Sequence, residues 1–232
     1  MIDPVIGARL VQQAYDPVFM ASQAVPDLSS LGFVFTDAIF GSEGTFSVPY
    51  GFLATNPGGG QVIAIRGTES IGEWIEDAAV HMETNPWGPG LVHHGFLGLC
   101  RSLGIGASRE PILGKIVSLA GLAVVGHSLG AAVGRLLTMQ LGHVGEIQTW
   151  GEPRSCNGDA AGYALSCATE SRRARNPRDL VPLVPVFDPC RPLDGYRHVG
   201  DPVKLQATGG DPVDAHAIET YVGLERIAAG KS

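Results

Sequence analysis

The stretch from Leu122 to Gly134 constrains the fold more than any other part of the chain. The apolar run Leu122–Val125 has the length of a buried strand, and the next five residues read Gly126-His127-Ser128-Leu129-Gly130. Small residues with the composition of a packed helix follow directly. A serine between two glycines, at the junction of a strand and a helix, occupies a sharp turn in which larger flanking residues would clash. The Ser128 hydroxyl is therefore expected above the end of a sheet.

Hydrophobic periodicity predicts that strands and helices alternate along the rest of the chain. No internal repeat or low-complexity linker interrupts this pattern, so residues 1–232 are read as one domain. Alternating elements of this kind favour an α/β fold whose central sheet is mostly parallel and flanked by helices. The expected strands are Phe52–Asn56, Gln61–Arg66, Leu119–Val125, Glu146–Trp150 and Ser171–Arg175, and Tyr196–Leu205 is read as a last strand or a hairpin. The expected helices are Val5–Tyr15, Glu69–Met82, one from Gly130 to about Leu141, and Ala215–Ala228.

The composition excludes several classes of protein. Of the 232 residues, 44% are hydrophobic and 17% are charged, which is typical of a chain with a large core rather than a disordered one. The formal net charge is −7 and the longest basic run is Arg172-Arg173, so no nucleic-acid partner is expected. The long uncharged stretch Ile116–Gly134 is rich in glycine and contains His127 and Ser128, so no transmembrane segment is expected either.

No metal or cofactor site is predicted. The four cysteines lack a zinc-binding spacing, and two readings remain open for them: a bridge between Cys156 and Cys167, or thiols that simply pack. The glycines at 58–60 lack dinucleotide-binding spacing and are read as a turn between two strands. Gly230-Lys231-Ser232 lacks the first glycine of a phosphate loop and has no helix after it.

His216 is the preferred base for Ser128. In folds that present a serine on such a turn, the acid and then the histidine follow the serine along the chain. His143 comes too early for this order, and His198 lies in a strand-like run where a histidine usually packs. His216 follows a Gly/Pro-rich segment and precedes the last expected helix, where a loop can carry it over the sheet. The alternative is an ordinary histidine at a helix N-terminus.

Asp179 is the preferred acid. It follows the expected strand Ser171–Arg175 through Asn176-Pro177, at the carboxyl end of a strand where sites of α/β proteins gather. Its task would be to hold the His216 tautomer and to stabilise the imidazolium. Asp188 and Asp194 are rivals for this role. The acids that follow them, Asp201, Asp211 and Asp214, are read as surface turn residues.

Taken together, these residues resemble the class 3 (fungal-type) lipases of the α/β-hydrolase superfamily. The resemblance runs from about Phe52 to Glu225 and rests on several motifs that occur in order. These motifs are Ile65-Arg66-Gly67-Thr68, Trp74 with Asp77, Val92-His93-His94-Gly95-Phe96, the serine turn, Thr149-Trp150-Gly151-Glu152-Pro153-Arg154, Asn176-Pro177-Arg178-Asp179-Leu180-Val181-Pro182, His198-Val199-Gly200 and Asp214-Ala215-His216.

The resemblance implies an α/β-hydrolase fold and a catalytic triad of Ser128, Asp179 and His216. It also implies an oxyanion hole formed by Thr68 and the backbone amide of Leu129; outside that role, Thr68 would be a turn residue at the end of a strand. Arg66 and His93 match family positions with a structural role. No metal and no cofactor are implied.

The expected helix at about 69–82 falls where this family carries its lid. Its apolar side chains include Ile71, Trp74 and Ile75, which would cover the site in water and turn toward a lipid surface. The alternative is a surface helix that stays packed.

The function implied by the resemblance is that of a serine carboxylic ester hydrolase, a lipase that cleaves acyl-glycerols or related lipid esters. Its partners would be an ester substrate and, transiently, a lipid–water interface. Feruloyl-type or short-chain esterase activity and phospholipase A1 activity are the alternatives on the same triad. An inactive hydrolase-fold binding protein is the alternative from a different class. The family implies secretion, whereas Met1–Pro4 show no signal-peptide pattern, so the compartment stays open.

Overall fold

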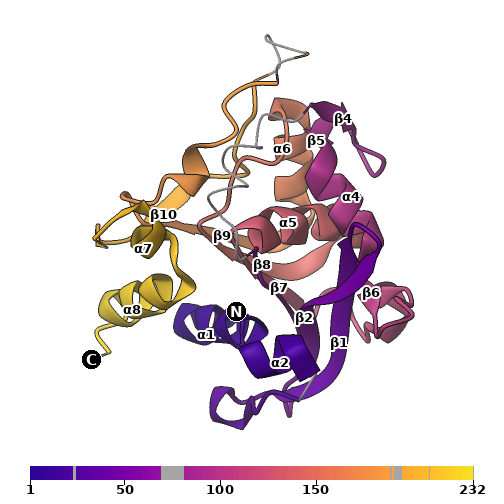
Figure 1. Cartoon of the computed structure of the whole chain (residues 1–232), viewed down its shortest axis with the longest axis vertical. Helices are drawn as coiled ribbons and strands as arrows, with labels where there is room; N and C mark the ends of the chain where they lie inside the picture. The colour runs from indigo at the N-terminus through magenta and orange to yellow at the C-terminus, as the bar shows by residue number, and fades with distance from the viewer. Residues whose placement is uncertain (23–24, 69–80, 189, 191–194, 209, 232) are drawn as a thin grey trace.

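The computed structural model describes residues 1–22, 25–68, 81–188, 190, 195–208 and 210–231. Its centre is an eight-stranded sheet with the strand order β10-β9-β8-β7-β3-β2-β1-β6 (Figure 1). Strands β3 and β7–β10 run parallel, and β1, β2 and β6 are antiparallel to their neighbours. The sheet strands are β1 (Val34–Glu43), β2 (Phe46–Thr55), β3 (Gln61–Ile65), β6 (Gly104–Ile105), β7 (Leu122–His127), β8 (Val144–Trp150), β9 (Ala168–Arg175) and β10 (Pro202–Lys204).

Helices cover both faces of this sheet, and each face has its own apolar core. One layer consists of α4 (His94–Ser102), α5 (Leu129–Leu141) and α6 (Gly158–Ser166), and the other of α1 (Pro4–Ala14) and α8 (Ile218–Ala228). Ile63 and Val124 face the first layer, whereas Val62 and Val125 face the second. Strands buried on both faces read as continuous apolar runs, which is why β3 and β7 stand out in the sequence.

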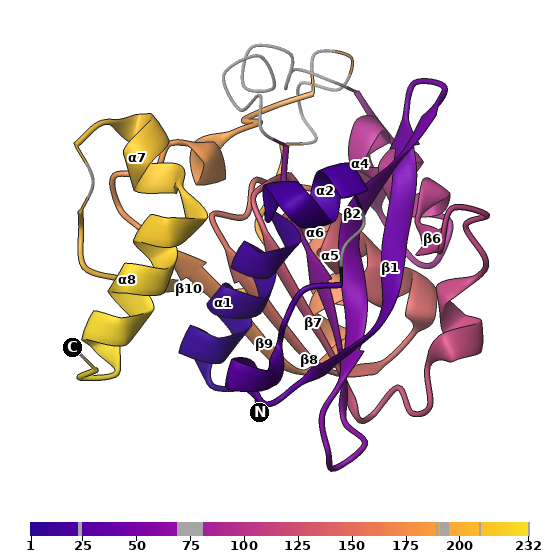
Figure 2. The same ribbon diagram turned by 60° about the horizontal axis from the view of Figure 1, so that its bottom comes forward.

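Shorter elements connect these layers. They are α2 (Pro17–Ser22), α7 (Pro212–His216), the 3-10 turns η1 (Ser29–Leu31), η2 (Ile112–Lys115) and η3 (Val181–Leu183), and a small second sheet of β4 (Met82–Thr84) and β5 (Leu91–His93). The parallel strands end at the upper edge in Figure 2, and segments 66–68 and 181–188 both lie along that edge. The chain termini lie away from it.

Three sequence expectations need correction or remain open. The expected lid helix cannot be described, because residues 69–80 lie outside the described residues, and these include Ile71, Trp74 and Ile75. Met82 was expected to be the last residue of that helix, but it begins strand β4. Within the expected strand Tyr196–Leu205, only Pro202–Lys204 forms one. The expected closing helix is two helices, because Ala217 has extended backbone angles and separates α7 from α8.

All four cysteines are thiols, and Cys100, Cys156 and Cys167 are buried. The reading as packed thiols therefore holds for these three, whereas Cys190 is exposed, and no bridge joins Cys156 and Cys167. Across the described ranges, no cluster of three His, Cys, Asp or Glu side chains has a metal-binding arrangement. Among the described helices, none combines the length and the apolar character needed to cross a membrane.

Candidate active site

Ser128 occupies the turn between β7 and α5 in a strained backbone conformation. Its φ is 56° and its ψ is −130°, a region that residues with a side chain rarely adopt. A Cβ added to Gly126 would lie 2.5 Å from the Gly130 carbonyl oxygen, and one on Gly130 would lie 2.3 Å from the Arg66 carbonyl oxygen. Both glycines are thus required by the close approach of α5 to the ends of β7 and β3. The predicted serine turn is present.

His216 and Asp179 form a buried hydrogen-bonded pair, although 37 residues separate them in the sequence. His216 Nδ1 lies 2.7 Å from Asp179 Oδ2, and the two side chains are 2% and 0% exposed. A ring nitrogen bonded to a carboxylate carries the proton, so Nε2 of the neutral ring is left as the basic nitrogen. The structure therefore brings together the predicted base and acid.

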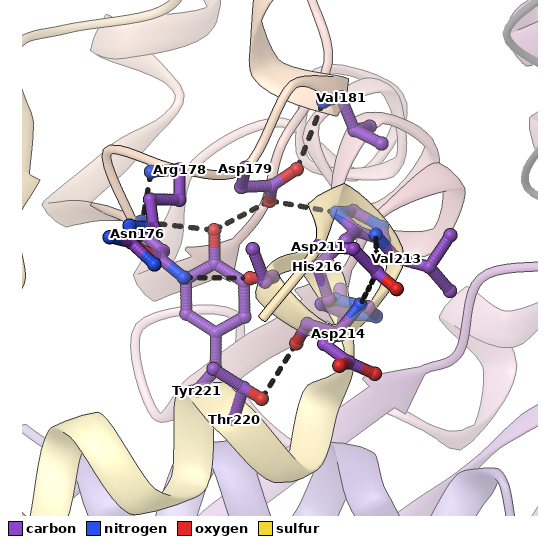
Figure 3. Close-up of polar contacts among 12 residues, drawn as sticks. Asn176, Arg178, Asp179, Val181, Asp211, Val213, Asp214, His216, Thr220 and Tyr221 are labelled. Atoms are coloured by element: carbon purple, nitrogen blue, oxygen red, sulfur yellow. Dashed lines mark hydrogen bonds and ion pairs between the residues drawn. The ribbon is translucent and has the colours of Figure 1, made fainter. Parts of the chain in front are cut away.

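Tyr221 is a second donor to the same carboxylate, and no sequence pattern indicated this role. Its hydroxyl donates to Asp179 Oδ2 at 2.7 Å and accepts from the Asn176 amide at 3.1 Å. Figure 3 shows the Tyr221 hydroxyl and the His216 ring both directed at this carboxylate. Burial and the nearby Asp179 charge hold the pKa of Tyr221 well above its usual value, so the phenol remains a donor. The Val181 amide donates to the other Asp179 oxygen.

Asn176 holds the loop that delivers His216. Its side-chain amide donates to the carbonyl oxygens of Thr208 at 2.8 Å and Ala215 at 2.9 Å. Asp211 then caps α7 by accepting from the Val213 and Asp214 amides (Figure 3). Asn176 and Asp211, which sequence reasoning read only as turn residues, therefore fix where the histidine emerges.

Among the described residues, the Ser128 hydroxyl and the second ring nitrogen of His216 have no hydrogen-bond partner. Ser128 Oγ and His216 Nε2 are both buried, and no bond joins them in this structure. The serine turn and the His216–Asp179 pair each pack closely against a glycine that follows a strand of the sheet, Gly67 after β3 and Gly151 after β8. A Cβ on Gly67 would lie 3.1 Å from Ser128 Oγ, and one on Gly151 would lie 2.8 Å from His216 Cε1. The Ser128 amide donates to the carbonyl of Trp150, which precedes Gly151.

A chain of buried hydrogen bonds passes through His127, the residue before the serine. The Gly67 amide donates to the Tyr15 hydroxyl at 2.7 Å, and this hydroxyl donates to His127 Nδ1 at 2.7 Å. His127 Nε2 donates to the His216 carbonyl oxygen at 2.7 Å. Burial and the neighbouring His216 hold the pKa of His127 well below its ordinary value. His127 is thus a neutral structural link, and the sequence did not distinguish it from the rest of the motif.

The predicted oxyanion-hole residues lie on neighbouring elements. Leu129 is the first residue of α5, whose N-terminal amides and helix dipole favour a negative charge. Thr68 follows β3 and lines a hollow of about 410 Å³ with Met20, Val48 and Arg66 among others. Because Gly67 packs against Ser128 and Gly130 packs against the end of β3, Thr68 and Leu129 both belong to the surroundings of the serine.

The rival acids and bases take other roles. Asp188 accepts from the Met82 and Cys190 amides and so ties a loop to β4, and Asp194 lies outside the described residues. His143 contacts Ser166 and Thr169 at the far end of α5. His198 lies close to Arg173, and burial and that charge lower its pKa to about 4.

A fully buried ion pair underlies this edge of the sheet. Arg135 Nη2 lies 3.0 Å from Glu152 Oε2, and both side chains have 0% exposure. Glu152 also accepts from the Thr149 hydroxyl, and Arg135 donates to the Ser171 hydroxyl. A buried charge is tolerated only when it is paired and hydrogen-bonded in this way. Glu152, part of one of the sequence motifs, thus joins α5 to β8.

The largely parallel sheet, with helices on both faces and a serine turn at its carboxyl edge, defines an α/β-hydrolase fold. Solved structures agree. A Rhizomucor miehei lipase in complex with its propeptide aligns with a TM-score of 0.66 at 20% identity, covering 95% of this chain and 77% of that one. A mutant of MDLA from Penicillium cyclopium aligns with a TM-score of 0.65 at 22% identity, covering 89% and 79%.

Sequence comparison places the chain within one family of that fold. The model of the family "Lipase (class 3)" matches residues 62–188. The secreted mono- and diacylglycerol lipase A of Penicillium cyclopium is 30% identical in an alignment of 197 positions that covers 78% of this chain and 60% of the relative. The chain thus spans about three fifths of the length of that relative. It belongs to the class 3 lipase family.

Proposed function

We propose that the protein is a serine carboxylic ester hydrolase that cleaves acyl-glycerols, with Ser128 as nucleophile, His216 as base and Asp179 as the acid that orients it. The observation that carries this proposal is the buried His216–Asp179 hydrogen bond at the edge of the sheet where the Ser128 turn stands. Membership of the class 3 lipase family and the printed activity of the Penicillium relative support the ester substrate.

In the first half of the reaction, His216 Nε2 takes the proton of the Ser128 hydroxyl as its oxygen attacks the ester carbonyl carbon. The tetrahedral oxyanion would be held by the amides of Thr68 and Leu129, and each such donor lowers the barrier by about 3 kcal/mol. Asp179 stabilises the imidazolium that forms. When the C–O bond to the alcohol breaks, His216 protonates the departing oxygen and Ser128 is left acylated.

In the second half, a water molecule attacks the acyl-enzyme while His216 takes one of its protons. Collapse of the second tetrahedral species releases the carboxylic acid, and the proton returns to Ser128. Since Ser128 Oγ and His216 Nε2 are not bonded in this structure, attack requires a small adjustment of the turn or ring; such bonds are often loose without substrate.

The decisive experiment compares the wild-type chain with Ser128→Ala. A fluorophosphonate probe should label the wild-type protein at Ser128, and Ser128→Ala should lose both labelling and nearly all ester turnover while unfolding at the same urea concentration. Substantial turnover in this variant would reject Ser128 as nucleophile. Absence of labelling in the wild-type protein would favour an inactive hydrolase-fold binding protein.

A substrate panel then separates the possible esters. Monoacylglycerol and diacylglycerol, which the Penicillium relative's name states as substrates, are expected to be cleaved. Feruloyl esters, short-chain esters and the sn-1 bond of phospholipids test the alternatives that the same triad could serve. Faster cleavage of any of these than of acyl-glycerols would reassign the substrate while leaving the proposed triad in place.

A further inference from the structure

The segment that follows Asp179 exposes an unusual number of large apolar side chains. Four such side chains fall between residues 180 and 187, and all are at least about one third exposed: Leu180 47%, Leu183 36%, Val186 61% and Phe187 54%. Scattered exposed apolar residues are normal, but a concentration on one surface segment marks a site of interaction.

Backbone contacts hold this segment in place. The Arg154 amide donates to the Val184 carbonyl at 2.9 Å, and its guanidinium donates to the carbonyls of Leu183 and Pro185. At the other end, Asp188 accepts from the Met82 amide at 2.7 Å. The apolar side chains are therefore presented by a fixed loop rather than exposed by fraying.

Positive charge borders the same segment. Arg154 and Arg197 line a hollow of about 330 Å³ together with Val186, Tyr196 and His198. Among the described residues, no carboxylate pairs with Arg154, Arg197 or the nearby Arg175. Burial and the charges of Arg197 and Arg175 lower the pKa of Arg154.

Two acids near this surface are already engaged by other groups. Asp188 is buried and accepts two backbone amides, and Glu152 is buried against Arg135. In a chain with a net charge of −7, a cluster of cations without carboxylate partners is complementary to an anionic partner.

We propose that Leu180, Leu183, Val186 and Phe187, together with Arg154 and Arg197, form a docking face for an anionic lipid surface. The apolar side chains would enter the boundary between head groups and acyl chains while the guanidinium groups bind lipid phosphates. The segment lies along the carboxyl edge of the sheet (Figure 2), next to Asp179, so docking would bring that surface to the site. The inference deepens the proposed function and predicts a preference for anionic over zwitterionic interfaces.

The test measures binding to vesicles directly, without turnover. Ser128→Ala protein is sedimented with vesicles of phosphatidylcholine alone and with vesicles containing phosphatidylglycerol. Anionic vesicles should bind more tightly, and Arg197→Gln should weaken that binding about fivefold, as expected for one cation near a charged surface. Val186→Ser with Phe187→Ser should weaken binding to both kinds of vesicle. Arg154 is left unchanged because it also holds the loop.

Arg226→Gln and Ile227→Ser on α8 are matched controls, since both side chains are exposed away from this face. They should leave vesicle binding unchanged. Equal binding to both kinds of vesicle would overturn the proposal, and so would unchanged vesicle binding by Arg197→Gln. The proposal would also fail if the protein associated with itself, and if Phe187→Ser abolished that self-association but left vesicle binding unchanged. Turnover of a soluble ester by Arg197→Gln in the otherwise wild-type chain should stay unchanged. This separate measurement distinguishes failure of the docking face from failure of the proposed function.

Discussion

The backbone carbonyl oxygen of His216 accepts a hydrogen bond of 2.7 Å from His127 Nε2. His127 precedes the serine turn, whereas His216 ends α7, so this single bond joins the strand before the proposed nucleophile to the segment that carries the proposed base. The two rings also lie 4.6 Å apart between centroids. Because both residues are buried, the bond contributes to the geometry of the site as well as to its stability.

Replacing His127 with phenylalanine should lower both stability and turnover. The variant leaves the buried His216 carbonyl without its donor, which costs about 1–3 kcal/mol of unfolding free energy. We also expect kcat to fall roughly tenfold or more, because small displacements of a catalytic group are expensive. Urea unfolding and ester kinetics measure the two effects.

His127→Gln is the matched control, because its side-chain amide can still donate to the His216 carbonyl. It should recover a substantial part of the turnover lost in His127→Phe. If the two variants lose turnover equally, the bond to His216 has no positioning role.

Tyr221→Phe should lower kcat with little change in KM. The substitution removes only the hydroxyl that donates to Asp179 and accepts from Asn176, and Tyr221 is buried away from any substrate. A hydrogen bond to a charged group contributes about 1.5–3 kcal/mol, so unfolding free energy should fall by a similar amount. Steady-state kinetics measures this effect: an unchanged kcat would mean that His216 and the Val181 amide suffice to orient the carboxylate.

Gly67→Ala should disable the site. The added Cβ would lie 2.7 Å from both Ser128 Cβ and the Tyr15 hydroxyl, so the serine turn or the Tyr15–His127 link must shift. Turnover should fall at least tenfold, whereas overpacking of this kind lowers stability by about 1–3 kcal/mol. Gly98→Ala on α4 is the control, since its Cβ meets open space and alanine favours the helix. Full activity in Gly67→Ala would argue against a tight approach of β3 to the serine.

His198 should make the protein less stable in acid. Burial and Arg173 lower its folded-state pKa from 6.5 to about 4, so the folded protein binds this proton less readily than the unfolded chain. The free energy of unfolding therefore decreases as pH falls from about 6.5 toward 4, with a slope of at most about 1.4 kcal/mol per pH unit from this group. Urea denaturation of wild type and His198→Asn across this range measures it. The variant should show the shallower slope, and parallel slopes would contradict the assignment.

The parts of the site that the sequence predicted are those fixed by local chemistry. Ser128 could be found because its turn needs Gly126 and Gly130 on either side of it. His216 and Asp179 were found from their order along the chain, and the structure joins them by a hydrogen bond. Tyr15, Asn176 and Tyr221 could not be found in this way, because their side chains act only where three distant segments meet, and no local pattern marks such a meeting.

Periodicity indicated the central strands β3 and β7, because residues buried on both faces must be apolar along most of their length. The same pattern failed where backbone geometry overrides composition. Ala217 divides the expected closing helix into two helices. Within Tyr196–Leu205, only three residues pair with β9. The sequence by itself thus determined the α/β pattern, the serine turn and the candidate acid and base. Only the tertiary structure decided which hydrogen bonds hold them and where the arginines gather, because both depend on contacts between segments far apart in the chain.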